Sequence, residues 1–463
     1  MPYEDEFAHK TAHMDFVKNP DVRAFLESCE YLTPPSPEEA ERIVAPFREP
    51  PRPADIVLPT NVLAVDGSPH EASHDELLPS TKIGFIKIGA VLFSLQEYGS
   101  LRSGRYVDPF RVASLQDNNA SLTFVVPSAN IRIRGKDNVR DSFRAVLDAQ
   151  FLAEATRFQP DNFHTSLRST LFHLAHRRPG IMGTRDPFHL KLHKCPDCEQ
   201  GPIELEDTLE QQHCPHCGAE VYPTDCLRLW EEINDYQSNQ LAINRLMMLL
   251  EHLLPVHYMR FIADQALFAL SKTAFFVDGP LAIFGTSAWL HLSIMSYLDE
   301  INRKLGRSNH PPVLMIGLVK TGQVVDHVHL LGRFIPPDRL FAIDDEYRYK
   351  YILAGRDPAG NGFGYETYYG QDFIFKTQSG RTFVFCLPYP FPNKNLPGNT
   401  FLQEKVNWDR YPQLATAVHL IEHLESDLYR NAVVPIALAH RYTAISLRPG
   451  GQVLDLLTKK ALQ

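Results

Sequence analysis

Two short segments of the sequence place an aspartate after an apolar run. Val62–Val65 leads into Asp66, Ala274–Val277 leads into Asp278, and a glycine follows each aspartate. Apolar runs of this length predict strands, and the glycine lets the chain turn sharply away. If the two strands are neighbours in one sheet, both carboxylates emerge at the same edge.

Such a pair of carboxylates predicts a divalent-metal site. Hard oxygen ligands are what Mg²⁺ or Mn²⁺ needs to activate water and to stabilise a phosphoryl leaving group. An Asp-Gly pair after a strand is also a common turn, and either instance taken singly is more often a turn than a ligand. The two instances together favour the metal interpretation of Asp66 and Asp278.

A third carboxylate is predicted at Glu251, within a helical pattern. Its neighbours three and four positions away are apolar, namely Met247, Met248, Leu254 and Pro255. A buried carboxylate without a partner is costly, so this position predicts a metal or a cation beside it. The competing Glu231 and Glu232 stand among polar residues, which is typical of a solvated face.

Two further polar residues close predicted strands. Lys320 follows Val313–Val319, and His440 follows Val433–Ala439. As parts of a nuclease, the lysine would neutralise the scissile phosphate and the histidine would bind metal or carry a proton. Each is, taken singly, more often an ordinary residue at a sheet edge. A rival pair, His327 and His329, would share a strand face and is interpreted as mainly structural.

Four cysteines form a separate metal-binding pattern. They stand as two Cys-x-x-Cys pairs, with 15 residues between the pairs: Cys195, Cys198, Cys214 and Cys217. This spacing is typical of a zinc ribbon, in which four thiolates surround one Zn²⁺. Because all four positions are filled by cysteine, no position remains for a reacting water, and the predicted zinc is structural.

A basic stripe precedes and enters a predicted helix over Lys136–Phe158. Its cations are Arg132, Arg134, Lys136, Arg140 and Arg144. Cations in such an arrangement bind the DNA backbone through phosphate contacts that weaken with salt. If the protein acts on DNA, this stripe is the candidate DNA path.

The elements that must position these side chains alternate between strands and helices. The predicted strands are Val62–Val65, Ile83–Leu95, Ala274–Val277, Val313–Val319, Thr382–Leu387 and Val433–Ala439. The predicted helices are a short one after Ser36, Lys136–Phe158, Leu227–Leu270, Trp289–Leu305 and Leu414–Tyr429. Leu227–Leu270 is expected as one long helix or as two consecutive helices that Pro255 separates. This alternation predicts an α/β protein with a mixed sheet flanked by helices.

Composition narrows the class of protein. Hydrophobic residues make up 44% and charged residues 22% of the 463 residues, which excludes a largely disordered chain. The first residues are polar and acidic, and no apolar run approaches the roughly 20 residues of a membrane span. We therefore expect a cytoplasmic protein without a transmembrane segment, with free thiols at Cys29, Cys226 and Cys386. The net charge of −9 neither supports nor excludes a local DNA-binding groove.

In their order along the chain, these segments resemble the NurA nucleases, which have an RNase H-like core. The resemblance rests on VLAVDGS, on a glutamate-bearing helix ahead of FFVDGPL, on LMIGLVKTG and on PIALAH, and it spans most of Asn61 to Leu447. Each motif is short, and their joint order is more specific than any one of them. The zinc ribbon departs from the compact members of the family and resembles longer ones.

The resemblance implies a metal-dependent DNA nuclease. It implies that Asp66, Glu251 and Asp278 bind catalytic Mn²⁺ or Mg²⁺, with Lys320 and His440 completing the site. It also implies a homodimer that docks on a HerA-type hexameric ATPase for DNA end processing, in repair or phage defence. The additional active-site tyrosine of the family would be Tyr429.

The expected organisation is a helical extension over residues 1–55, a NurA core over 56–190 and 227–463, and a zinc ribbon inserted at 191–226. Two alternatives remain open. One is a catalytically silent zinc-ribbon adaptor that binds DNA or a motor protein. The other is an RNase H-like ribonuclease, which a comparison of RNA with DNA as substrate would distinguish.

Overall fold

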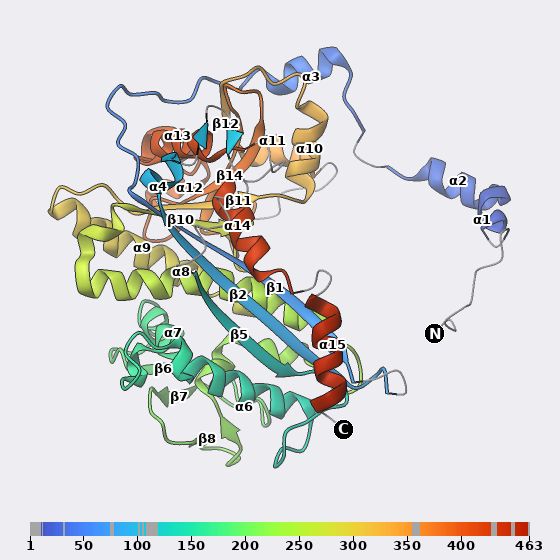
Figure 1. The fold of residues 1–463 in the computed structure, drawn as a ribbon, viewed down its shortest axis with the longest axis vertical. Coiled ribbons are helices and arrows are strands. Elements are labelled where there is room, and N and C mark those ends of the chain that lie inside the picture. The colour runs from blue at the N-terminus through green and yellow to red at the C-terminus, as the bar shows by residue number, and fades with distance from the viewer. Residues whose placement is uncertain are drawn as a thin grey trace.

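A computed structural model of the chain describes residues 11, 13–30, 33–74, 78–100, 102–103, 106–107, 119–353, 362–426, 433–445 and 450–461. Its centre is one eight-stranded sheet (Figure 1). In spatial order the strands are β12 (Arg339–Ala342), β13 (Gly370–Lys376), β14 (Thr382–Pro388), β11 (Leu314–Val319), β10 (Thr273–Asp278), β1 (Asn61–Ser73), β2 (Lys82–Ser94) and β5 (Asn119–Pro127).

The directions of the strands define the core of this sheet. β1, β2 and β5 form an antiparallel meander, while β10 and β11 run parallel to β1 on its other side. The order β5-β2-β1-β10-β11 with these directions is that of an RNase H-like sheet, as the resemblance implied. β14, β13 and β12 extend it by antiparallel pairing.

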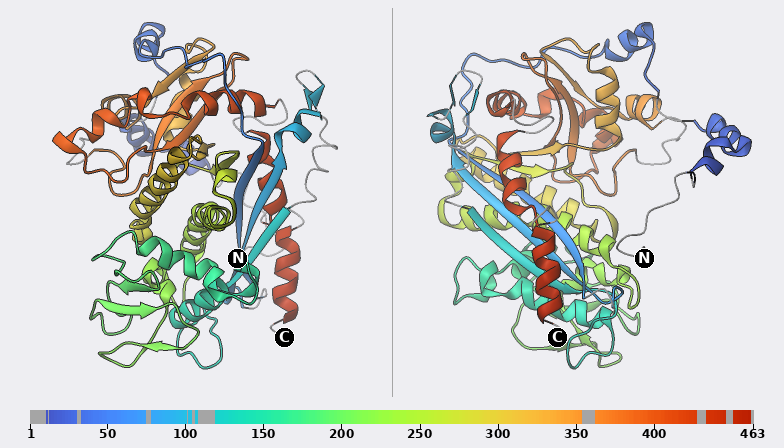
Figure 2. Two further views of the ribbon diagram at one scale, coloured as in Figure 1. Left: turned by 90° about the vertical axis from the view of Figure 1, so that its left-hand side faces the viewer. Right: turned by 45° about the vertical axis from the view of Figure 1, so that its right-hand side comes forward.

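Helices cover both faces of the sheet, as the left view of Figure 2 shows for β1, β2 and β5. One face packs against α6 (Val139–Leu152), α7 (Leu167–Ala175), α8 (Gln240–Leu270) and α9 (Leu290–Arg307). The other packs against α13 (Leu414–Leu424) and α14 (Val434–Thr443), with α15 (Gly450–Ala461) beside β1. Along β1, Leu63 and Val65 enter the first core and Val62 and Ala64 the second, because successive side chains of a strand point to opposite faces.

The remaining elements are short. The helices among them are α1 (Met14–Lys18), α2 (Pro20–Ser28), α3 (Pro37–Val44), α4 (Leu95–Ser100), α10 (Gln323–Leu331), α11 (Asp345–Tyr347) and α12 (Phe401–Glu404). The strands among them are β3 (Arg102–Ser103), β4 (Tyr106–Val107), β6 (His189–Leu192), β7 (Ile203–Glu206), β8 (Gln212–His213) and β9 (Glu220–Val221). Within the described parts of the chain, no helix is long and apolar enough to cross a membrane.

Most of the predicted strands and helices are present, and two of these predictions were wrong. Val433–Ala439 belongs to helix α14 and its N-cap and does not form a strand. A short apolar run that is buried all round fits either element. Pro435 occupies a position in the first helical turn, where the missing backbone N–H costs no helical hydrogen bond. His327 and His329 lie on helix α10, so they do not share a strand face. Of the two alternatives for the long helical segment, the structure has one helix, α8, which continues through Pro255 and departs from helical geometry at Ala266.

The predicted DNA-binding stripe is largely occupied by contacts to the zinc ribbon. Arg144 is buried, and its guanidinium donates to both carboxylate oxygens of Asp225 at 2.9 and 2.8 Å. Lys136 forms an ion pair with Glu220 and donates to the hydroxyl of Tyr222 at 2.9 Å. The prediction that Arg144 binds DNA was therefore wrong, because periodicity alone cannot tell which face of a helix another segment covers.

Replacement of Arg144 by methionine tests this packing role. The substitution leaves Asp225 buried and uncompensated, so we expect a loss of about 3–5 kcal/mol in the free energy of unfolding. Urea denaturation measures the loss, and Arg134→Ala, at an exposed position of the same stripe, is the control and should cost less than about 0.5 kcal/mol. Equal effects of the two substitutions would contradict the assignment.

Candidate active site

The strand register brings the two predicted aspartates together. Val65 pairs with Val277 in the parallel ladder of β1 and β10, so Asp66 and Asp278 follow as neighbours. Both side chains lie on the face occupied by Ala64 and the residues of the second core, because they stand two positions beyond them. β1 itself does not end at Asp66 as predicted: its pairing with β2 continues to Ser73, and only β10 stops there.

The two carboxylates are in direct contact and differ in their affinity for a proton. Burial opposes the ionisation of Asp66, but hydrogen bonds from His440 and Asp278 and the charge of Lys320 outweigh it and hold its pKa below the usual value. Burial and the charge of Asp66 raise the pKa of Asp278 to about 6, although Lys320 lies with Nζ 2.6 Å from its Oδ2. Asp278 therefore takes up a proton at a higher pH than Asp66 does.

Glu251 approaches the two aspartates from helix α8, which lies on the opposite face of the sheet. Its Oε1 accepts a hydrogen bond from the backbone N–H of Gly67 at 2.8 Å. Burial, followed by the charges of Asp66 and Asp278, raises the pKa of Glu251 well above its usual value. A Cβ at position 67 would lie 2.7 Å from Cγ of Met247, so this approach of α8 to β1 requires the glycine.

The last turn of helix α14 lies over Asp66. Nδ1 of His440 and Oγ1 of Thr443 each lie 3.0 Å from Oδ2 of Asp66. The bond to Asp66 raises the pKa of His440, whose side chain is 52% exposed. His440 was predicted at the end of a strand and lies in a helix. Thr443 was not predicted, because a threonine after an apolar run carries no signal of its own.

The donor set fits a hard divalent cation. Three carboxylates meet around one lysine, and a cation would relieve the repulsion among them. Within the described residues, however, the ligand atoms of these carboxylates do not all lie within 4.8 Å of one another, as those of the four cysteines do. Direct contact of one ion with all three carboxylates therefore requires a movement of the side chains.

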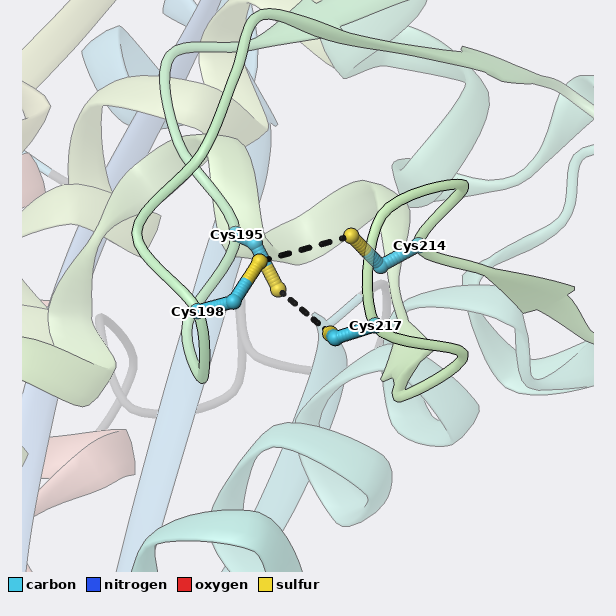
Figure 3. A group of neighbouring side chains, drawn as sticks. All are labelled: Cys195, Cys198, Cys214 and Cys217. Carbon is cyan, nitrogen blue, oxygen red and sulfur yellow. Dashed lines mark hydrogen bonds between the residues drawn. The ribbon is translucent and has the colours of Figure 1, made fainter.

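The four cysteines converge as predicted (Figure 3). The Sγ atoms of Cys195 and Cys217 are 3.7 Å apart, and those of Cys198 and Cys214 are 3.8 Å apart. The backbone N–H groups of Asp197 and His216 point at the sulfurs of Cys195 and Cys214, each at 3.4 Å. Four thiols with this separation and with amide donors are suited to hold Zn²⁺ as thiolates.

Other residues singled out from the sequence lie elsewhere. Glu231 pairs with Arg228 and Glu232 with Arg245, as expected of a solvated face. His327 is buried and lies 2.9 Å from the hydroxyl of Tyr347, which supports its structural interpretation. Tyr429 lies outside the described residues.

The strand order of the sheet and the acidic side chains where β10 ends place this chain in the class of RNase H-like proteins. Within that class, the model of the NurA domain matches residues 60–445. The chain therefore belongs to the NurA family, a family of nucleases. It is also similar to a solved structure titled "Crystal structure of NurA", at 11% identity and a TM-score of 0.29, over 92% of this chain and 93% of that one. A TM-score this low does not establish that the two structures share a fold. A comparison with curated proteins found no match to the chain.

Removal of one zinc ligand tests the cysteine site. We expect the wild-type protein to contain one zinc per chain by elemental analysis. Cys214→Ser should lose the metal and lower the thermal midpoint by about 5–10 °C, because Cys195 and Cys214 are part of the core that also contains α8. Cys29→Ser, at an exposed thiol outside the cluster, should change neither quantity. A wild-type protein free of zinc would contradict the assignment.

The pH dependence of stability tests the burial of Glu251. In protein without Mn²⁺ or Mg²⁺ but with zinc retained, the raised pKa means that the fold favours the protonated carboxyl. This stabilisation is complete below the usual pKa of 4.5 and is lost as the pH rises toward the pKa of the folded state. Glu251→Gln should therefore flatten the fall in thermal midpoint as the pH rises above 4.5. Parallel curves for the two proteins would rule out the buried, raised carboxyl.

Proposed function

We propose that the chain is a metal-dependent DNA nuclease whose catalytic Mn²⁺ or Mg²⁺ is held by Asp66, Asp278 and Glu251. The observation that supports it is the meeting of these carboxylates, from β1, β10 and α8, in a family of nucleases. When bound, such an ion activates a water for attack on a phosphodiester and stabilises the departing oxygen.

The chain's own residues supply the remaining functions in this proposal. Lys320, which is a quarter exposed beside Asp278, neutralises the negative charge of the scissile phosphate. His440 is held through Nδ1 by Asp66, and its half-exposed ring can carry a proton through Nε2. We favour this proton transfer over metal binding for His440, since Nδ1 is engaged with the carboxylate.

We further propose a route for DNA and a mode of assembly. Arg132, Arg134 and Arg140 remain outside the buried part of the basic stripe, and they contact the phosphates of DNA. Membership of the NurA family supports a homodimer and a HerA-type hexameric ATPase as partner, in DNA end processing for repair or phage defence. Stimulation of DNA degradation by the ATPase and ATP would test the partnership.

Cleavage assays on the purified chain decide between this proposal and its two alternatives. Asp66→Asn and Asp278→Asn should each lower the Mn²⁺-dependent degradation of labelled duplex DNA by about 100-fold or more, because each removes a charged ligand. Asp264→Asn, at an exposed position of α8, is the matched control and should retain full activity.

Each alternative makes a different prediction in the same assay. A wild-type protein that binds DNA but never cleaves it would be an adaptor, and one that degrades only RNA would be a ribonuclease. Asp66→Asn protein as active as the wild type would refute the assignment of the catalytic site.

A further inference from the structure

The hydroxyl of Thr443 is buried between the carboxylate of Asp66 and the backbone of its own helix, α14. Thr443 is fully buried, and its Oγ1 lies 3.0 Å from Oδ2 of Asp66 and 3.0 Å from the carbonyl oxygen of Ala439. A hydroxyl has a single hydrogen to donate, and a charged acceptor makes the stronger bond. The carboxylate is therefore the favoured acceptor, and the carbonyl oxygens of Ala439 and His440 are the alternative acceptors for the same hydrogen.

Strand β2 holds the last turn of α14 against the sheet. Nζ of Lys87 donates to the carbonyl oxygen of Tyr442 at 2.8 Å and lies 4.4 Å from the centre of its ring. The carbonyls at the end of a helix lack partners within the helix, and a lysine is a common partner for them. Gly89 allows the close approach, because a Cβ there would lie 2.6 Å from Cγ2 of Thr443.

Two side chains of this turn contact the same oxygen of Asp66. His440 and Thr443 stand three positions apart, so both project from one side of the helix toward Oδ2. Both hydrogen bonds engage Oδ2, so neither of them engages Oδ1. His440 is half exposed, whereas the buried Thr443 does not exchange its bond for one to water.

We propose that Thr443 is a positioning residue that orients the Asp66 carboxylate for the cation. This inference rests on the proposed function, since the ion is the one that Asp66 is proposed to bind. Partners of metal ligands fix the direction of the ligand atoms, and their loss commonly weakens metal binding by 10- to 100-fold. Thr443 does not contact the ion or the DNA in this assignment and acts only through Asp66.

Calorimetric titration of Mn²⁺ into the zinc-loaded, full-length protein tests the assignment. Thr443→Val keeps the volume and removes the hydroxyl, and we expect it to raise the Kd for Mn²⁺ by about 10-fold or more. Thr443→Ala should do the same without the branched side chain, which covers the case in which the valine variant does not fold. Thr443→Ser restores the hydroxyl and should bind Mn²⁺ within about threefold of the wild type.

Thr458→Val is the matched control. Thr458 is also a buried helical threonine whose Oγ1 donates to the carbonyl four positions earlier, that of Leu454, at 2.9 Å. Its replacement should leave the Kd unchanged. A loss of affinity in Thr458→Val equal to that in Thr443→Val, or full affinity in folded Thr443→Val and Thr443→Ala, would overturn the positioning role.

The titration also separates this inference from the proposed function. If the wild type binds Mn²⁺ and Asp66→Asn does not, the proposed site stands and only the threonine variants decide the inference. If Asp66→Asn binds Mn²⁺ as tightly as the wild type, the metal site is elsewhere and both assignments fall.

Discussion

The repulsion among three neighbouring carboxylates, of which Asp66 and Glu251 are buried and Asp278 is partly buried, is the constraint on which the centre of this structure depends. Asp66, Asp278 and Glu251 come from three different elements, and each would be unstable as an isolated buried charge. The fold compensates with the charge of Lys320, the backbone N–H of Gly67 and the last turn of α14. A bound cation would relieve the repulsion among these carboxylates. A fold that keeps such a cluster therefore favours cation binding at this site, as the proposed chemistry requires.

The extended strands β1 and β2 make this arrangement possible. They remain paired from Asn61 to Ser73, well beyond the point where β10 stops. Beyond the end of β10, β1 continues without this neighbour, and helices approach this part of β1 from both faces of the sheet. Helix α8 brings Glu251 there, and helix α14 brings His440. The zinc ribbon shares a core with α8, so it supports the helix that carries Glu251.

Several features of the site could be predicted from local sequence, and others could not. The strand-Asp-Gly motifs identified Asp66 and Asp278, and the apolar surroundings of Glu251 identified a buried charge. The prediction for Arg144 in the basic stripe was wrong because Asp225, which is 81 positions away in the sequence, covers it. The helical state of Val434–Thr443 and the presence of Thr443 at Asp66 likewise depend on contacts between distant segments.

The sequence by itself determined which residues have the chemistry of ligands: four cysteines at ribbon spacing, and carboxylates at the ends of apolar runs. These signals are local, since ligand type, spacing and burial pattern are written into a few neighbouring residues. Only the tertiary structure decided which of them meet and at what distance. The parallel register of β1 with β10, the absence of a side chain at Gly67 and the closeness of α14 to Gly89 are properties of packing. They bring three carboxylates, a lysine and a histidine from distant parts of the sequence into one region of the sheet.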